Sequence, residues 1–436
     1  MASLNGIGRY FGGMGRALSA RNYRVYWYGH LFSSNGVWIY LISSQWLMFH
    51  FTRSPAWLGA VGFAFMAPLF FFGPLAGAIS DRYGHRRTGI VALSLGIAMS
   101  LITVISIAAG LLTPLLLFGF TVVQGTFMSF DYPARQALIP QLIDRKNLSA
   151  AIGMNLVTFN AAGFTGPVIG GVILSFGNST YGEPLGAALS YATSALASSC
   201  MVFGMTQVQI INPLPVVKHR GSLIPSILSD LRAGIFYIME SASLKIIMVL
   251  SIFVALCLRS HQVLMAGFAK EVFQLDEQGL GMLLAASGIG ALSVAFILAV
   301  RGRIEGLTRI FVYSAMLTAV ALLAFVSTKQ VSLALIAMVF VGGLIVATDL
   351  GAQTLIQNMV VDEYRARVIS ISVSIAWGGP AFGTLAIGWL AELLGFQLAL
   401  GAAAITVLMA VALLGRKLLF RSAEIEAEPA PLGFKN

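Results

Sequence analysis

Between two long apolar segments the sequence reads Gly77-Ala-Ile-Ser-Asp81-Arg82-Tyr-Gly84-His85-Arg86-Arg87. Two glycines, one aspartate and a cluster of basic side chains share this short connection. Gly77 allows a neighbouring helix to approach closely, and Gly84 allows a sharp turn of the backbone. Asp81, at a helix end, can meet the positive N-terminus of another helix. The stretch therefore predicts a tight, charged turn between two apolar helices.

The chain around this turn has the composition of a membrane protein. Hydrophobic residues make up 58% of the 436 residues and charged residues only 10%, whereas an ordinary soluble domain carries about 25% charged residues. Apolar segments of about 20 residues can cross a bilayer core of ~30 Å. We therefore predict an all-α polytopic membrane protein, not an enzyme, with twelve transmembrane helices near residues 24–49, 57–79, 88–110, 115–139, 148–175, 184–206, 245–269, 279–300, 307–327, 332–357, 367–394 and 397–419.

The basic residues predict the orientation of these spans. With the N-terminus in the cytoplasm, the 27 Lys and Arg residues fall in cytoplasmic segments, except Arg53, Lys270 and Lys329 on the outer side and Arg259 inside a span. Because positive residues favour the cytoplasmic side, both termini are expected there. No signal peptide is recognisable ahead of the first span.

A weak internal repeat divides the chain. Asp131 and Asp349 lie in apolar stretches 218 residues apart, half the length of the chain, and Asp144 faces Asp362 at the same offset. Such symmetry is a feature of transporters. It predicts two pseudo-symmetric six-helix bundles, residues 1–206 and 245–420, joined by a cytoplasmic linker at 207–244 with an interfacial helix and followed by a disordered cytoplasmic tail at 421–436.

The charged turn resembles the signature loop of the major facilitator superfamily. That resemblance implies the major facilitator fold, with a cytoplasmic latch that holds the two bundles together in the outward-open state. The latch would use Gly77, Asp81, Arg82, Gly84, Arg86, Arg87 and Arg135. Alternatively, the arginines only satisfy the positive-inside rule. The equivalent loop of the second bundle is degenerate, so an asymmetric latch is expected.

A second motif resembles the antiporter motif of the same superfamily. It comprises Gly153, Gly166, Pro167, Gly170 and Gly171, with Ala162 where the pattern has glycine. Small residues and a proline produce a closely packed, kinked helix, and generic packing is the alternative interpretation. The resemblance implies export. Thr121 stands where drug antiporters of this group carry an arginine, so proton antiport is less firmly indicated than export.

Further stretches resemble the branch of the superfamily that contains the enterobactin exporter and macrolide efflux proteins. They are Arg21–Arg24, Asp131–Leu138 and the pair Asn155 and Asn160.

Three titratable residues inside the spans are candidates for proton coupling. Acids in apolar segments are usually functional. Asp131 has Arg135 one helical turn away and can form an ion pair with it, which leaves a structural role open. Asp349 has no basic residue at three or four positions on either side; we therefore interpret it as unpaired and as the better proton carrier. His30 is the third candidate, with a hydrogen-bonded structural role as its alternative.

Arg259 has no acid on its own helix at neighbouring turns. Because a guanidinium stays charged, it needs an acid from another helix, water, or an anionic group of a substrate. The other candidates for a substrate cavity are the polar and aromatic residues His261, Asn35, Trp38, Gln124, Asn155, Asn160 and Trp377, for which packing is the alternative role.

Neither a nucleotide-binding loop nor a spacing typical of metal ligands occurs in the sequence, so no cofactor or metal is expected. The two cysteines lie in apolar segments. Together these features predict a monomeric secondary exporter in a bacterial inner membrane. It would move a small amphipathic organic molecule, siderophore-like or drug-like and anionic if it contacts Arg259, out of the cytoplasm in exchange for protons. The alternatives are an importer, a facilitator or flippase for a lipid such as a lysophospholipid, and a non-transporting sensor or scaffold.

Overall fold

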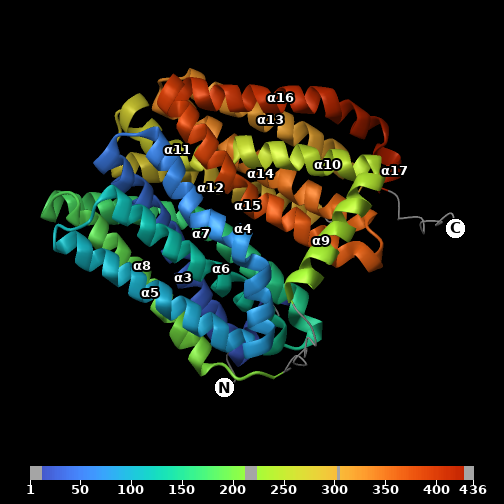
Figure 1. Ribbon diagram of the computed structural model, residues 1–436, viewed down its shortest axis with the longest axis horizontal. Coiled ribbons are helices and arrows are strands. Elements are labelled where there is room, and N and C mark those ends of the chain that lie inside the picture. Colours follow the sequence, from blue (N-terminus) through green and yellow to red (C-terminus); the bar gives the residue numbers. More distant parts are fainter. Residues whose placement is uncertain (1–11, 212–222, 302–304, 427–436) are drawn as a thin grey trace. The chain divides into compact units, whose positions relative to one another are not determined.

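The computed structural model describes residues 12–211, 223–301 and 305–426, and within these ranges it contains helices and no strands (Figure 1). All twelve predicted spans lie in helices. These are α3 (Arg21–Thr52), α4 (Pro55–Tyr83), α5 (His85–Ala108), α6 (Pro114–Leu142), α7 (Arg145–Tyr181), α8 (Leu185–Gln207), the α10–η2 segment (Ala242–Val272), α12 (Glu277–Arg301), α13 (Leu307–Ser327), α14 (Val331–Met359), α15 (Asp362–Leu394) and α16 (Phe396–Phe420).

Eleven of these helices are long and apolar enough to cross a membrane by length and composition alone. The remaining one, α3, has 32 residues but is more polar than the others, because serine, asparagine and histidine side chains interrupt its apolar sequence. Many of these polar side chains are buried inside the protein. The first span therefore faces protein rather than lipid along much of its surface.

The seventh span is not a regular α-helix. It consists of α10 (Ala242–Phe253), the π-helix η1 (Val254–Leu258), α11 (His261–Gly267) and a second π-helix, η2 (Phe268–Val272). Such π-helical turns are uncommon and are frequent at functional sites. The first of them places Arg259 directly after its last residue.

Within the described residues, three shorter helices lie outside the spans: α2 (Gly12–Ser19), α9 (Leu223–Glu240) and α17 (Ser422–Glu426). The predicted linker helix is present as α9, and the remainder of the linker, 212–222, lies outside the described residues. The prediction of a disordered tail is wrong for α17. There the carboxylate of Glu426 accepts hydrogen bonds from the backbone N–H groups of Gly306 (2.6 Å) and Thr308 (2.9 Å) at the start of α13.

Side chains and glycines define where the helices begin and end. The hydroxyls of Thr113 and Ser241 accept hydrogen bonds from backbone N–H groups in the first turns of α6 and α10, the usual role of an N-cap residue. Gly84, between α4 and α5, has a φ of 89°. This left-handed conformation confirms the sharp turn predicted there.

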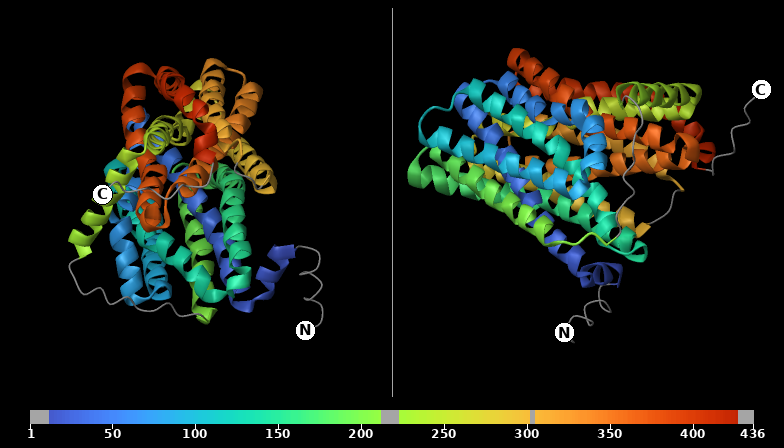
Figure 2. Two further views of the ribbon diagram at one scale, coloured as in Figure 1. Left: turned by 90° about the vertical axis from the view of Figure 1, so that its right-hand side faces the viewer. Right: turned by 60° about the horizontal axis from the view of Figure 1, so that its bottom comes forward.

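The contacts of the chain divide it into two compact units. Unit 1 comprises residues 1–53, 67–219 and 274–288, and unit 2 comprises residues 54–66, 220–273 and 289–436. In unit 1, α3 packs against α7 and α8, and α5 packs against α6 and α8 (Figures 1 and 2). In unit 2, α13 packs against α14 and α16, and α15 packs against η1, α16 and α9.

Each unit includes the beginning of a helix from the other half of the chain. The start of α12 packs on α7 in unit 1, where a Cβ atom added to Gly281 would lie 2.7 Å from the carbonyl oxygen of Pro167. The start of α4 packs on α15 in unit 2, where a Cβ atom at Gly388 would lie 2.7 Å from the Cα atom of Gly59. Small residues permit this close approach of helix backbones.

Candidate functional site

The aspartate of the first bundle forms a buried ion pair on α6. Arg135 Nη2 lies 2.7 Å from Asp131 Oδ2, and the two side chains are only 9% and 4% exposed. Arg135 Nη1 also donates a hydrogen bond to Ser33 Oγ on α3 (2.9 Å). The i, i+4 pairing predicted from the sequence is confirmed. A buried pair is strongly destabilising to break, and the hydrogen bond from Arg135 to Ser33 joins α6 to α3.

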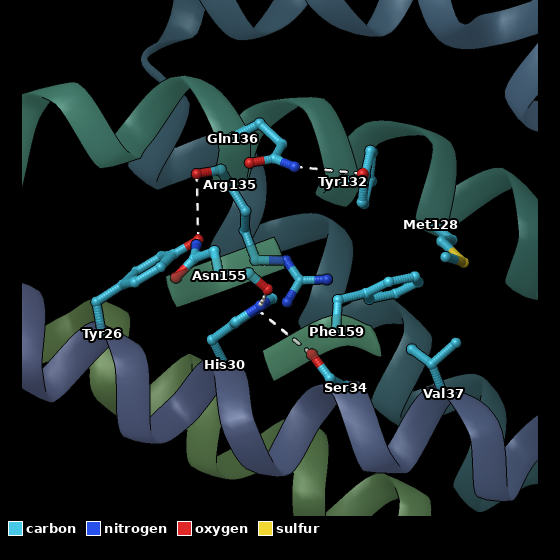
Figure 3. Close-up of a pocket in the computed structure, with 10 residues that line it drawn as sticks. All are labelled: Tyr26, His30, Ser34, Val37, Met128, Tyr132, Arg135, Gln136, Asn155 and Phe159. Carbon is cyan, nitrogen blue, oxygen red and sulfur yellow. Dashed lines mark hydrogen bonds between the residues drawn. The ribbon is translucent and has the colours of Figure 1, made fainter. Parts of the chain in front are cut away.

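A pocket lies beside this pair within unit 1 (Figure 3). Its cavity volume is about 20 Å³, which is room for about one water molecule and lies well below the roughly 300–1,000 Å³ of small-molecule sites. Figure 3 shows the Arg135 side chain extending from α6 towards α3. The lining residues are Tyr26, His30, Ser34, Val37, Met128, Tyr132, Arg135, Gln136, Asn155 and Phe159.

His30 is held in place at this pocket by hydrogen bonds. Its Nε2 lies 3.3 Å from the carbonyl oxygen of Asn155, and its Nδ1 lies 3.5 Å from Ser34 Oγ. The Oδ1 atom of Asn155 accepts a hydrogen bond from the Tyr23 hydroxyl (2.9 Å). Two of the predicted residues, His30 and Asn155, therefore meet at one pocket together with Arg135.

Several residues of this network were not singled out by the sequence analysis. Tyr26 donates a hydrogen bond from its hydroxyl to the carbonyl oxygen of Arg135 (3.2 Å), and Trp27 donates one to Thr158 Oγ1 (2.9 Å). The helical spacing of Tyr23, Tyr26 and His30, three and four residues apart, places them on one face of α3. That spacing could have indicated their shared role.

The aspartate of the second bundle also has an arginine partner. Asp349 on α14 forms an ion pair with Arg259, which follows η1 in the seventh span. The interpretation of Asp349 as unpaired is therefore wrong, because its partner comes from another helix. Of the alternatives open for Arg259, the structure supplies an acid from another helix. Both side chains are accessible, at 30% for Asp349 and 27% for Arg259.

His261 lies next to this second pair but is fully buried. Its Nδ1 lies 2.6 Å from the carbonyl oxygen of Leu258. Among the described residues, its Nε2 has no hydrogen-bond partner.

The other predicted cavity residues do not line the pocket of unit 1. Asn35 accepts a hydrogen bond from Thr165 Oγ1 on α7 (2.6 Å), and Trp38 packs against Gly163 and Gly166 of the same helix. Gln124 lies against Gly96, and Asn160 donates a hydrogen bond to the carbonyl oxygen of Leu156 in its own helix. Trp377 belongs to α15, and its side chain is outside the described ones.

The residues proposed for a cytoplasmic latch have local partners. Arg86 donates hydrogen bonds to the carbonyl oxygens of Met205 and Thr206 at the end of α8, both at 2.7 Å. Asp81 Oδ1 lies 3.5 Å from His85 Nε2. The guanidinium of Arg82 lies over the ring of Tyr83. The expected close approach at Gly77 is not found among the described residues, where a Cβ atom on Gly77 would meet nothing within 4 Å. Arg87 is exposed.

Three glycines of the antiporter motif lie at close helix contacts. A Cβ atom at Gly166 or Gly170 would lie 2.5 Å from Trp38 Cβ or 2.7 Å from Ile42 Cγ2 on α3, and one at Gly171 would lie 2.8 Å from the carbonyl oxygen of Glu277 on α12. Gly153 differs, since it has open space around it. Pro167 lies inside α7. The motif therefore packs α7 against two helices at once.

The fold and these sites define a membrane transporter of the major facilitator superfamily. Residues 16–432 match the model of the family described as "Transmembrane secretion effector", and the chain belongs to this family.

The relatives of the chain are transporters as well. It is 22% identical over 397 residues to the staphyloferrin A transporter of Staphylococcus aureus, covering 89% of this chain and 95% of that one. It is 24% identical over 379 residues to the multidrug efflux pump Tap of Mycobacterium tuberculosis, covering 84% and 86%.

Solved structures share the fold at low sequence identity. An inward-facing, occupied structure of a bacterial homologue of the lysosomal transporter Spinster has a TM-score of 0.69 at 14% identity, covering 94% of this chain and 99% of that one. The D-xylose–proton symporter has a TM-score of 0.68 at 16% identity, covering 91% and 97%.

Proposed function

We propose that this transporter exports a small amphipathic organic molecule, siderophore-like or drug-like, from the cytoplasm by alternating access and in exchange for protons. The observation that carries the proposal is that the aspartates at equivalent positions of the two halves, Asp131 and Asp349, each have an arginine partner: Arg135 on the same helix for Asp131, and Arg259 on another span for Asp349. Ion pairs inside membrane spans are costly and typically mark transport pathways.

The chemistry of the pocket lining in unit 1, and not its small volume in this structure, supports a role in substrate binding. It combines aromatic and apolar side chains, such as Phe159 and Met128, with the polar groups of His30, Asn155 and Arg135. A mainly apolar lining with a few placed polar groups is typical of small-molecule sites. An amphipathic molecule has an apolar surface that matches the apolar side chains and a polar surface that matches the polar groups.

The direction of transport is proposed from the packing of α7 and from the relatives. The closely packed Gly166, Gly170 and Gly171 support the antiporter motif, and one relative is described as an efflux pump. The distribution of basic residues supports cytoplasmic termini, and we place the protein in a bacterial inner membrane as a monomer.

Three groups are proposed for proton coupling: Asp131, Asp349 and His30. The pairing of Asp349 with Arg259 removes the reason for preferring Asp349 among them. Protonation of either aspartate would weaken its ion pair and thereby favour one conformation of its bundle over another.

The test is efflux from proteoliposomes of known protein orientation, with and without an imposed pH gradient. Staphyloferrin A and a panel of lipophilic drugs would be loaded, and Asp131→Asn, Asp349→Asn and His30→Gln would be compared with the wild type. We expect gradient-dependent efflux that at least one variant loses. Efflux that ignores the gradient in every protein would reject proton exchange and favour a facilitator or flippase. Uptake in place of efflux would reject export.

A further inference from the structure

The two aspartate–arginine pairs differ in their accessibility. Asp131 and Arg135 are 4% and 9% exposed, whereas Asp349 and Arg259 are 30% and 27% exposed. The second pair is therefore partly exposed. The first pair is closed and its arginine is also bonded to Ser33. The two aspartates occupy equivalent positions, but their ion pairs differ in exposure and in where the arginine comes from.

Arg259 contacts Asp349 through its Nη2, and its Nε is buried and has no hydrogen-bond partner among the described residues. A guanidinium carries five N–H donors in a planar fork, and that fork matches the two oxygens of a carboxylate, sulfonate or phosphate group. Asp349, a single carboxylate, occupies the place that such a group would take.

An anion that binds Arg259 changes the net charge of the Arg259–Asp349 site. The pair Arg259–Asp349 has no net charge. If an anionic group bound Arg259 in place of Asp349, the freed carboxylate would leave one uncompensated negative charge inside a membrane span, which is costly. A proton from water on the Asp349 carboxylate restores neutrality.

We propose that the anionic group of the substrate replaces Asp349 at Arg259, and that Asp349 takes up a proton in the same state. In this step the Arg259–Asp349 ion pair breaks, a pair between Arg259 and the substrate anion forms, and one proton moves from water to Asp349. The inference rests on the proposed transport function and specifies its substrate class as organic anions. Because linkage is reciprocal, the proton and the anion bind this place cooperatively.

A proton exchanged for the substrate must then be carried elsewhere. A group that binds its proton together with the anion cannot release that proton in exchange for it. The remaining candidates are Asp131 and His30 of unit 1. The second bundle would select the anion, and the first bundle would couple its movement to protons.

Other titratable groups lie on the helices around this pair. His261 is two residues from Arg259 in the sequence. Helices α10, α13, α15 and α17 pack against α14. The described titratable side chains on these helices are Lys245, Arg309, Tyr313, Glu363, Tyr364, Arg365, Arg367, Glu392, Glu424 and Glu426.

The test is binding of naphthalene-2-sulfonate to the full-length protein in nanodiscs, from mildly acidic to mildly alkaline pH. The sulfonate stays ionised throughout, so any pH dependence belongs to the protein. We expect the wild type to bind it more tightly at acidic pH. Asp349→Asn should bind it independently of pH, and at alkaline pH about tenfold more tightly than the wild type, because one competing charge-assisted hydrogen bond is gone.

Two further variants and a second probe serve as controls for this test. Asp349→Glu should retain the pH dependence, and the neutral pair Arg259→Gln with Asp349→Asn should lose sulfonate binding. Phenyltrimethylammonium, a fixed cation, should bind Asp349→Asn no more tightly than it binds the wild type. Weaker sulfonate binding by Asp349→Asn, a pH dependence that persists in it, or no sulfonate binding by any protein would overturn the proposal. Because this assay needs no transport, a failure of efflux alone would reject only the proposed function.

Discussion

Asn178, in the last turn of α7, donates a hydrogen bond of 2.7 Å to the carboxylate of Glu277, the first residue of α12. The Glu277 side chain is buried, so this bond joins two spans that are far apart in the sequence. Hydrogen bonds to a charged acceptor contribute about 1.5–3 kcal/mol. We expect Asn178→Ala to lower the free energy of unfolding by about 1–2 kcal/mol, measured by thermal unfolding in detergent.

The neighbouring Ser179 provides the control for this first prediction. It is exposed, and its hydroxyl bonds only to the carbonyl oxygen of Phe176 in its own helix. Ser179→Ala should therefore leave the unfolding temperature unchanged. Equal effects of the two substitutions would show that the bond to Glu277 contributes nothing.

The buried pair on α6 predicts a non-additive pair of substitutions. Arg135→Met leaves the Asp131 carboxylate buried without its partner, which should cost about 3–5 kcal/mol. Replacing Asp131 by leucine in the same protein removes that charge and should restore most of the lost stability. Denaturant unfolding of the wild type, both single variants and the double variant gives the coupling energy. Additive effects would contradict the pairing.

Replacing a glycine of α7 by alanine should change the stability of the protein differently at Gly171 and at Gly153. A Cβ atom at Gly171 would lie 2.8 Å from a backbone oxygen of α12, whereas Gly153 has open space. Gly171→Ala should therefore destabilise the protein by about 1–3 kcal/mol through overpacking. Gly153→Ala should be neutral or slightly stabilising, because alanine favours a helix. Thermal unfolding of both variants checks this, and a destabilised Gly153→Ala would contradict it.

The docking of α17 predicts a dependence on pH. Burial acts to raise the pKa of the Glu426 carboxyl, but hydrogen bonds from Gly306 and Thr308 and the charge of Arg309 outweigh it and lower the pKa below its ordinary value of 4.5. A lowered pKa means that the ionised carboxylate stabilises the docked state above about pH 4.5. That stabilisation is lost as the pH falls through the lowered pKa.

Amide hydrogen exchange at Gly306 and Thr308 measures this docking directly. Protection of the two amides should fall on acidification, and Glu426→Gln should reduce it already at neutral pH. Glu424→Gln, an exposed change on the same helix, serves as the control. Protection that is equal in the three proteins would reject a role for Glu426.

Hydropathy was sufficient to predict eleven of the twelve spans, because a span needs a long apolar segment whatever its neighbours are. The pair of Asp131 with Arg135 was also predictable, since both residues lie one turn apart on the same helix. The partner of Asp349 was not, because Arg259 is 90 residues away and only tertiary packing brings the two together. The π-helices beside Arg259 likewise left no signal in the periodicity of the sequence.

Each unit includes the start of a helix from the other half of the chain, and this bears on whether the two halves can fold separately. A break in the chain between α8 and α9 would give two fragments. The first fragment would lack the start of α12, which packs on α7, and the second would lack the start of α4, which packs on α15. Neither fragment would be self-sufficient. Produced together in one cell, they should complement each other and co-purify, so covalent continuity through the linker is dispensable for assembly.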